Sequence, residues 1–204
     1  MYIITAPWLL RKLFPSFLTW EIPNNNNEIY LTFDDGPHPV ATPFVLNLLK
    51  DYKAKATFFC IGKNVNEQPQ LYRKILNEGH GVGNHTYNHL NGKKSNDKDY
   101  IENIIEANKI IDSNLFRPPY GAITSLQARQ LNSIYRIIMW NVLSADFDTK
   151  ITKEKCLNNV MKNTKPGSII VFHDSEKAFP HLEYVLPRAI NYFTEKNFKM
   201  GKIK

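Results

Sequence analysis

Residues 28–39 read EIYLTFDDGPHP, and this stretch places two adjacent carboxylates, Asp34 and Asp35, directly after an apolar run. The run EIYLTF is rich in β-branched and aromatic residues, which predicts a buried strand. Gly36 and Pro37 interrupt a ladder of hydrogen bonds, so the strand is expected to end at the aspartates. A buried strand that ends in two carboxylates is typical of an α/β protein whose strand ends carry the chemistry.

Strand-like and helix-like segments alternate along the rest of the chain, with short connections between them. The predicted strands are 28–33, 55–61, 80–85, 114–119, 135–142, 167–174 and 197–203. The predicted helices are 42–53, 66–77, 97–111, 124–131, 153–162 and 182–196. This alternation predicts a parallel sheet in an α/β fold. About seven such repeats without a linker can close into a (β/α) barrel as a single domain.

The composition is that of a globular domain and gives little sign of an unusual partner. The 204 residues are 43% hydrophobic and 22% charged, which is ordinary for a folded protein. The formal net charge is +7. The lysines are spread along the chain and no nucleic-acid-binding motif is present, so we expect no nucleic-acid partner. Cys60 and Cys156 lie far apart and do not form a disulfide framework. We expect a monomer.

Residues 1–27 are apolar and aromatic, and they precede the predicted catalytic domain at 28–204. They do not have the order of a signal peptide, because the basic pair Arg11-Lys12 follows the apolar stretch. Prolines interrupt the stretch, so no transmembrane span is expected. We expect the segment to pack on the domain, and the sequence leaves the compartment open. The alternative is a weak membrane-surface anchor, with the side chains Trp8, Leu9, Leu10, Phe14, Phe17 and Trp20.

Residues able to do chemistry recur at the carboxyl ends of the predicted strands. They are Asp34 and Asp35, His85 and His89, Arg117 and Tyr120, Asp146 and Asp148, and His173 and Asp174. The carboxyl ends of parallel strands form the active-site face of barrels and doubly wound sheets. Scattered surface residues would not fall on one edge in this way, so the pattern predicts one catalytic site.

The stretch HTYNH, residues 85–89, carries two histidines four residues apart. On a helical turn this spacing places both imidazoles on one face, where they can bind one cation. A catalytic zinc ion takes three protein ligands and keeps an open position, so a third ligand is wanted. Asp34 or Asp35 can supply it.

The two aspartates can divide two roles, because successive side chains of an extended chain point in opposite directions. One carboxylate binds the cation, and the other takes a proton from the water that the cation activates. The spacing does not say whether Asp34 or Asp35 holds either role.

The stretch LFRPPYG, residues 115–121, is stiff and presents one backbone donor. Pro118 and Pro119 lack N–H groups, so the N–H of Tyr120 is the first one after Arg117 and can contact an oxyanion. Arg117 can hold a carboxylate through two hydrogen bonds. A surface turn with an exposed arginine explains the same residues equally well.

His173 lies in IIVFHD, residues 169–174, at the end of a buried strand. A histidine in this position is a candidate general acid near neutral pH. Asp146 can orient its imidazole as a carboxylate does in a catalytic triad, and Asp148 is the alternative in that role. No GxSxG, P-loop or GxGxxG motif is present. The remaining chemistry is metal-assisted hydrolysis by activated water. We expect His38, His80 and His181 to be structural or exposed.

Taken together, the motifs resemble those of the polysaccharide deacetylases, carbohydrate esterase family 4, also called the NodB-homology domain. Five family motifs occur in order: TFDDGP at 32–37, HTYNH at 85–89, RPPY at 117–120, WNVLSADF at 140–147 and IIVFHD at 169–174. The resemblance implies a distorted (β/α) barrel and a divalent cation, zinc or cobalt. It also implies removal of acetyl groups from an N-acetylated polysaccharide, chitin-like or peptidoglycan.

The resemblance also implies a role for each motif residue. The implied cation ligands are Asp35, His85 and His89. The implied catalytic residues are the base Asp34, its holder Arg117, the oxyanion donor Tyr120, the acid His173 and its partner Asp146. The substrate-binding residues expected from the same motifs are Pro118, Tyr120, Trp140, Phe147 and Val171.

Two positions depart from the family pattern. Phe147 stands where the fourth motif usually has tryptophan, and Phe172 stands where the fifth often has leucine. Both are expected near the apolar pocket for the acetyl methyl group. Two alternative functions remain: a related amide hydrolase acting on a small molecule, and a non-catalytic carbohydrate-binding relative. The filled catalytic positions disfavour the second alternative.

Overall fold

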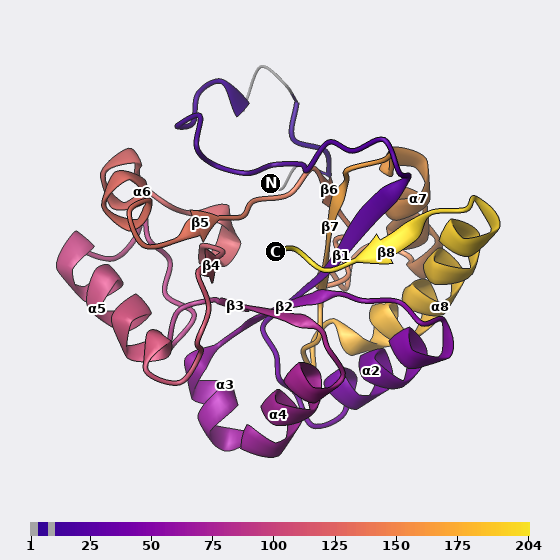
Figure 1. Cartoon of the computed structure of the whole chain (residues 1–204), viewed down its shortest axis with the longest axis horizontal. Coiled ribbons are helices and arrows are strands. Elements are labelled where there is room, and N and C mark those ends of the chain that lie inside the picture. The colour runs from indigo at the N-terminus through magenta and orange to yellow at the C-terminus, as the bar shows by residue number, and fades with distance from the viewer. Residues whose placement is uncertain (1–3, 8–10) are drawn as a thin grey trace.

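The computed structural model describes residues 4–7 and 11–204, which form one α/β domain around a curled parallel sheet (Figure 1). The strands are β1 (Glu28–Asp34), β2 (Thr57–Cys60), β3 (Gly81–Asn84), β4 (Leu115–Phe116), β5 (Arg136–Ile137), β6 (Val142–Leu143), β7 (Ile169–His173) and β8 (Lys199–Gly201). The helices are α2 (Ala41–Asp51), α3 (Gly62–Glu67), α4 (Pro69–Asn77), α5 (Asp97–Asn108), α6 (Ser125–Leu131), α7 (Lys153–Asn163) and α8 (Phe179–Glu195), with the 3-10 helix η1 (Pro119–Gly121). The predicted single-domain barrel-like α/β fold is confirmed.

The strand order forces the sheet to curl. The order is β5-β4-β3-β2-β1-β7-β6, and β8 pairs with the start of β1 outside this path. The two edge strands, β5 and β6, are separated by only residues 138–141. An extended chain of that length reaches about 18 Å, whereas a flat sheet of seven strands is about 29 Å wide. The sheet therefore bends into a half-barrel that brings its edges together.

The segment before β1 lies along the gap between the two edge strands (Figure 1). The N–H of Thr19 donates to the carbonyl of Ile137 at 2.9 Å, and the N–H of Met139 donates to the carbonyl of Thr19 at 2.7 Å. On β6, the N–H of Leu143 donates to the carbonyl of Ile4, which lies earlier in the same segment, at 2.8 Å. These bonds give the edge groups partners that a neighbouring strand would otherwise supply.

Three aromatic side chains of the same segment, Phe14, Phe17 and Trp20, pack against the core cluster that includes Phe116 and Met139. Trp8, Leu9 and Leu10, the other side chains of the alternative membrane anchor, lie outside the described residues. Within the described part of the chain, no helix is both long enough and apolar enough to cross a bilayer.

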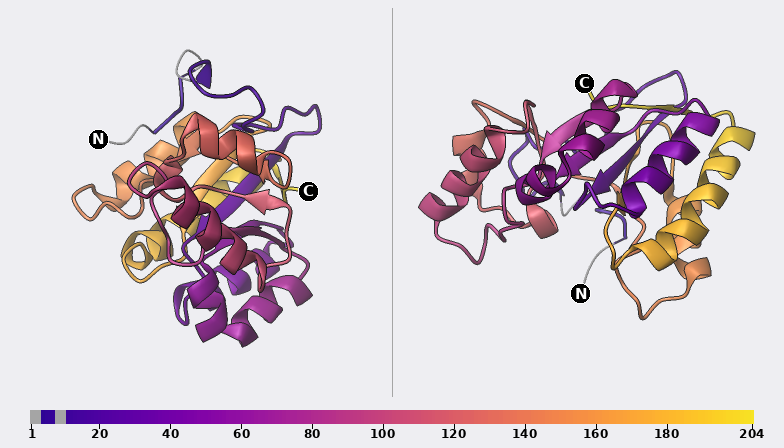
Figure 2. Two further views of the ribbon diagram at one scale, coloured as in Figure 1. Left: turned by 90° about the vertical axis from the view of Figure 1, so that its left-hand side faces the viewer. Right: turned by 90° about the horizontal axis from the view of Figure 1, so that it is seen from below.

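Strand alternation separates the helix-facing core from the barrel interior. Phe33 is the register partner of Phe58 on β2 and of Phe172 on β7. The rings stack with centroids 5.1 and 5.8 Å apart and are buried under the helix layer. Figure 2 shows the helices wrapped around the outer side of the sheet. The next residues along these strands, Asp34 and His173, are register partners of each other on the opposite face.

Two predicted elements are wrong in detail. The single strand expected at 135–142 is two short strands, β5 and β6, at opposite edges of the sheet. Between them, the carbonyls of Ile138 and Met139 accept hydrogen bonds from the Arg117 guanidinium at 3.2 and 3.1 Å. The helix expected at 66–77 is divided into α3 and α4, because Pro69 begins a new helix at its first turn.

Candidate active site

A cavity of about 760 Å³ opens at the carboxyl ends of the strands. Nine of the residues singled out in the sequence line it: Asp34, Asp35, His85, His89, Tyr120, Trp140, Phe147, Val171 and His173. Four further lining residues were not predicted: Leu143, Ser175, Glu176 and Lys177. The last three belong to the loop directly after β7. The only signal for them in the sequence was their position after a strand that ends in a candidate catalytic residue.

Three of the lining residues form a cluster that fits a metal ion. One ligand atom each from Asp35, His85 and His89 lie within 4.8 Å of one another. Oδ1 of Asp35 is 3.2 Å from Nε2 of His89 and 3.8 Å from Nε2 of His85. This oxygen is buried and makes no hydrogen bond among the described residues. Two imidazole nitrogens and one carboxylate oxygen are the donor set that a divalent cation takes in catalytic sites.

The two histidines lie on a loop, so the expected helical turn is wrong. His85 directly follows β3, and the backbone has φ of 63° at Thr86 and 57° at His89, which no helix contains. The side-chain oxygen of Asn84 accepts a hydrogen bond from the N–H of Thr86 at 2.8 Å and holds the first reversal. The loop, rather than helical spacing, brings the imidazoles together, with ring centroids 5.1 Å apart.

The surroundings of His85 prepare its Nε2 for a cation. Its Nδ1 lies 2.8 Å from the carbonyl of Arg117, so Nδ1 carries the proton and donates to that carbonyl. Burial lowers the pKa of His85 to about 4, although the charges of Asp34 and Asp35 act in the opposite direction. A neutral imidazole offers a free lone pair, which is the form that binds metals.

Asp35 does not follow the extended alternation expected after β1. The strand ends at Asp34, and Asp35 has φ of 78°, so both carboxylates line the same cavity. The side-chain amide of Asn64 donates to the carbonyl of Asp35 at 2.7 Å and supports this conformation. Burial acts to raise the pKa of the Asp35 carboxyl. The nearby imidazoles of His89, His173 and His85 outweigh burial and hold that pKa well below its usual range.

Asp34 and Arg117 form a buried ion pair beneath the cavity. Nη1 of Arg117 donates to Oδ1 of Asp34 at 2.6 Å, and the two side chains are 0% and 5% exposed. The same Nη1 donates to the hydroxyl of Thr32 at 2.7 Å, and the guanidinium carbon lies 4.0 Å from the centre of the Phe59 ring. With Ile138 and Met139 also accepting, the guanidinium has a fixed place inside the barrel. The surface-turn interpretation of Arg117 is wrong.

His173 and Asp146 form a second pair on the other side of the cavity. Nδ1 of His173 lies 2.7 Å from Oδ1 of Asp146, and the N–H of His173 donates to Oδ2 at 2.8 Å. Burial alone would lower the pKa of His173. The charge and hydrogen bond of Asp146, with smaller contributions from Asp35 and Asp34, raise that pKa to about 9. The imidazolium is therefore the main form near neutral pH.

Asp148, the alternative partner of His173, bonds within its own loop. Its N–H donates to the carbonyl of Ala145 at 3.0 Å, and its Oδ1 accepts from the N–H of Lys150 at 3.0 Å. Phe147, between the two aspartates, turns its ring edge-on to His173 with centroids 5.1 Å apart. The structure thus pairs His173 with Asp146 rather than with Asp148.

Phe172, which was expected near the pocket for the acetyl methyl group, and Pro118, a predicted substrate contact, do not line the cavity. Phe172 is buried under the helices, because strand alternation gives the cavity face to Val171 and His173 instead. Pro118 does not line the cavity either, although Tyr120 two residues later does. Tyr120 has φ of 61°, and its ring lies 4.6 Å from that of His89. The turn after Pro119 therefore brings Tyr120 beside the metal cluster.

The three remaining histidines have structural partners. Nδ1 of His38 accepts from the N–H groups of Val40 and Ala41 before α2. His80 is buried, and Nε2 of His181 pairs with the carbonyl of Ile151 at 2.9 Å. None of the three lines the cavity.

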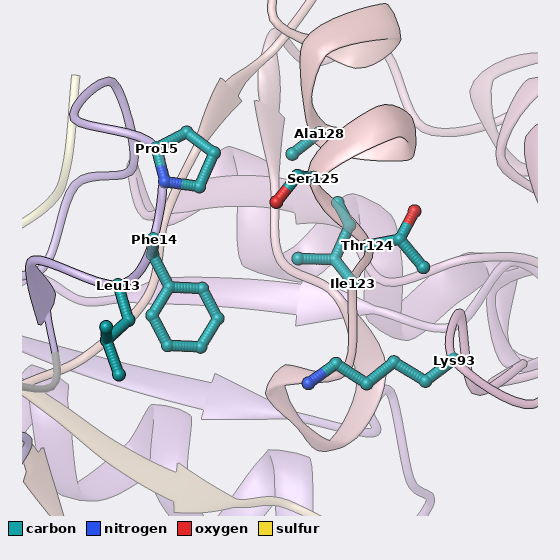
Figure 3. A pocket seen from close by; sticks show the side chains of 8 residues that line it. All are labelled: Leu13, Phe14, Pro15, Lys93, Ile123, Thr124, Ser125 and Ala128. Atoms are coloured by element: carbon teal, nitrogen blue, oxygen red, sulfur yellow. The ribbon is translucent and has the colours of Figure 1, made fainter.

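A second cavity, of about 510 Å³, lies between the N-terminal segment and α6 (Figure 3). Its wall is largely apolar, with Phe14 and Ile123 facing each other. Lys93 is the one charged residue among those that line it. It contains no group of titratable residues comparable to the first cavity.

A curled parallel half-barrel with a two-histidine, one-carboxylate cluster and two ion pairs at its strand ends has the architecture of a hydrolase that works with a divalent cation. Comparison with known proteins agrees, since the family described as polysaccharide deacetylase matches residues 21–134. The chain belongs to the polysaccharide deacetylase family.

Relatives within the family are similar over most of the chain. A peptidoglycan-N-acetylglucosamine deacetylase of Bacillus cereus is 42% identical over 175 residues, which cover 81% of this chain and 82% of that protein. A chitooligosaccharide deacetylase of Azorhizobium caulinodans is 37% identical over 161 residues, covering 75% and 76%. The crystal structure of a peptidoglycan N-acetylglucosamine deacetylase in complex with 4-naphthalen-1-yl-N-oxidanyl-benzamide has a TM-score of 0.86 and 32% identity. The match covers 97% of this chain and 95% of the chain in that crystal structure.

Proposed function

We propose that the protein removes N-acetyl groups from N-acetylglucosamine residues of a peptidoglycan or chitin-like polysaccharide, with a zinc or cobalt ion held by Asp35, His85 and His89. The observation that carries the proposal is the arrangement of one cavity. The metal cluster, a buried carboxylate and a histidine paired with aspartate all line it. The named relatives act on glycans of this kind.

The cation would polarise a carbonyl group and lower the pKa of a water molecule toward ~7. Asp34 acts as general base and takes a proton from the attacking water. Arg117, with the carbonyls and hydroxyl around it, keeps this carboxylate in place. As the new carbon–oxygen bond forms, the backbone N–H of Tyr120 donates to the developing oxyanion.

The amide carbon–nitrogen bond then breaks, and His173 gives its proton to the departing sugar nitrogen. Asp146 orients the imidazole and keeps it protonated until that step. Acetate and a free amino sugar are the products. The apolar side of the cavity, formed by Trp140, Leu143, Phe147 and Val171, suits the acetyl methyl group and excludes water from it.

Acetate release tests this proposal. Purified protein, loaded with zinc or cobalt or stripped by a chelator, is incubated with chitin oligomers, peptidoglycan and acetylxylan. We expect cation-dependent release from chitin oligomers or peptidoglycan. No release from any glycan by cation-loaded protein would contradict the proposal, and release from small acetamides alone would favour the small-molecule alternative.

Two variants separate the roles. Asp34→Asn is expected to reduce turnover by about 10²–10⁴-fold while the cation remains bound, measured by calorimetry. Loss of the cation in this variant would mean that the roles of Asp34 and Asp35 are exchanged. His173→Ala is expected to slow turnover on an acetamide by a similar factor, and near-normal rates would remove it as the acid.

A further inference from the structure

Asp174 is a buried carboxyl group that has no role in the proposed mechanism. It follows His173 at the end of β7 and has no exposed surface. Its Oδ1 accepts a hydrogen bond from the N–H of Gly36 at 3.1 Å, and its Oδ2 accepts one from the hydroxyl of Thr42 at 2.5 Å. Its own N–H donates to the carbonyl of Asp34 at 3.1 Å. Asp174 therefore joins the end of β7 to the turn after β1 and to the first turn of α2.

The turn that carries Asp35 is built around this carboxyl group. A Cβ atom added to Gly36 would lie 2.1 Å from Oδ2 of Asp174, so a side chain at position 36 and the carboxyl group exclude each other. The backbone of this turn is also bonded from the α3 side of the cavity. The N–H of Ile61 donates to the carbonyl of Gly36 at 2.9 Å, and the Asn64 side chain donates to the carbonyl of Asp35.

Asp35 needs such support because its backbone is in the left-handed region, with φ of 78°. For a residue other than glycine this conformation is unfavourable, and it persists only where the surrounding structure holds it. The bond from Gly36 to Asp174 fixes the peptide directly after Asp35 from the β7 side. The bond from Asn64 fixes the same peptide from the other side, and the bond from Ile61 fixes the peptide that follows it.

We propose that Asp174 is a positioning residue that holds the Asp35–Gly36 turn, so that Oδ1 of Asp35 converges with the imidazoles of His85 and His89 on one cation. The inference rests on the proposed function only in taking this cluster as the cation site. Partners that orient metal ligands typically change cation affinity by about 10–100-fold when they are removed. The same link keeps the histidine acid on β7 at a constant distance from the base on β1.

Cation affinity of the stripped protein tests the role without relying on turnover. We expect Asp174→Ala to weaken zinc or cobalt binding by about 10–100-fold, measured by calorimetry or chelator competition. Asp174→Asn keeps an oxygen for the Gly36 N–H and places an amide beside Thr42, so its affinity is expected to stay within about threefold of the wild type. Thr42→Val removes one of the two partners and is expected to have an intermediate effect.

Asn24→Ala is the matched control for a loss of stability alone. Asn24 makes three hydrogen bonds at the start of β1, two with Glu28 and one with Ile22. That end of the strand lies roughly 20 Å from the cavity, given seven residues at about 3.3 Å each. This variant is expected to lower the unfolding temperature without changing the cation affinity.

The outcomes distinguish the two proposals. Wild-type affinity in Asp174→Ala would overturn the positioning role and leave the cation site intact. An equal loss of affinity in Asp174→Ala and Asn24→Ala would also overturn it, because stability alone would then explain the effect. Failure of the wild-type protein to bind zinc or cobalt would overturn the proposed cation site itself. A selective loss in Asp174→Ala, restored in Asp174→Asn, would support the inference.

Discussion

The two ion pairs of the active site use the same chemistry in opposite orientations. On β1 the carboxylate of Asp34 faces the cavity and the cation of Arg117 lies behind it. On β7 the imidazole of His173 faces the cavity and the carboxylate of Asp146 lies behind it. Asp34 and His173 are register partners on neighbouring strands. Inverting one pair relative to the other places a proton acceptor and a proton donor side by side.

We expect the pair that holds the proposed base, Asp34, to be the more sensitive of the two, because its rear partner, Arg117, is a fully buried cation. Arg117→Met leaves the Asp34 carboxylate buried without a counter-charge, which costs about 3–5 kcal/mol of unfolding free energy. We also expect turnover to fall by about 10²–10⁴-fold, since the base is no longer held. Denaturant unfolding and acetate release measure the two effects. Adding Asp34→Asn should recover part of the stability and none of the turnover; a double variant less stable than Arg117→Met would contradict this.

In the second pair, we expect the removal of Asp146 to change the pH dependence of the proposed acid, His173. In Asp146→Asn the pKa of His173 is expected to fall from about 9 toward its usual 6.5. At pH 8 the protonated fraction then falls about 30-fold, and the alkaline limb of kcat/KM moves to lower pH. An unchanged limb would exclude His173 as the acid.

The raised pKa of His173 also makes the stability of the protein depend on pH. Since the folded-state pKa of His173 is raised, its contribution to stability is complete below pH 6.5 and is lost as the pH rises through about 9. In Asp146→Asn this loss should be absent. Unfolding free energies of the two proteins at pH 6 and pH 9.5 measure it.

Two phenylalanines test which side chains belong to the cavity and which to the core: Phe147 lines the cavity and Phe172 lies in the core. Phe147→Ala removes a wall beside His173 and is expected to lower kcat/KM by roughly tenfold, with little loss of stability. Phe172→Ala opens a hole in the stacked core and is expected to cost about 3–5 kcal/mol of unfolding free energy, with kcat/KM of the folded protein unchanged. Exchange of these two outcomes would mean that the cavity face of β7 is assigned wrongly.

The smallest change in turnover is expected for Asp148, two residues after Asp146. Asp148→Asn should change turnover less than twofold and leave the pH profile in place, because His173 forms its two hydrogen bonds with Asp146. Asp146→Asn, two residues earlier, is the matched comparison. A shifted alkaline limb in Asp148→Asn would show that both aspartates act on His173.

The strand ends of the site could be read from the sequence because apolar runs and turn residues mark them locally. Asp34, Arg117 and His173 lie at the ends of β1, β4 and β7, as the alternation predicted. Successive side chains of a strand point to opposite faces of the sheet, so Val171 lines the cavity whereas Phe172 points into the core. The expectation that Phe172 lies near the acetyl pocket is wrong, because strand alternation turns its ring into the core under the helices.

The remaining errors concern residues whose conformation depends on distant partners. The bend between β5 and β6 is supported by Arg117, about twenty residues earlier, and the loop of His85 and His89 is held by Asn103 of α5. The left-handed backbone of Asp35 depends on Asp174 and Asn64. No local pattern records such contacts, so the sequence predicted which residues meet but not the turns that bring them together.

The segment that lies along the gap between β5 and β6 has a consequence for the order of folding. Its bonding partners, Ile137 and Met139, are more than a hundred residues further along the chain. Contacts of such sequence separation form slowly, because a long loop must close before they are gained. The amides of Gly81 and His85, in contrast, bond to carbonyls of Ala56 and Cys60 that lie much closer in sequence. We therefore expect the amide of Thr19 to become protected from hydrogen exchange after those of Gly81 and His85 during refolding, although the segment is synthesised first. Pulse labelling that found Thr19 protected as early as these two amides would contradict this order.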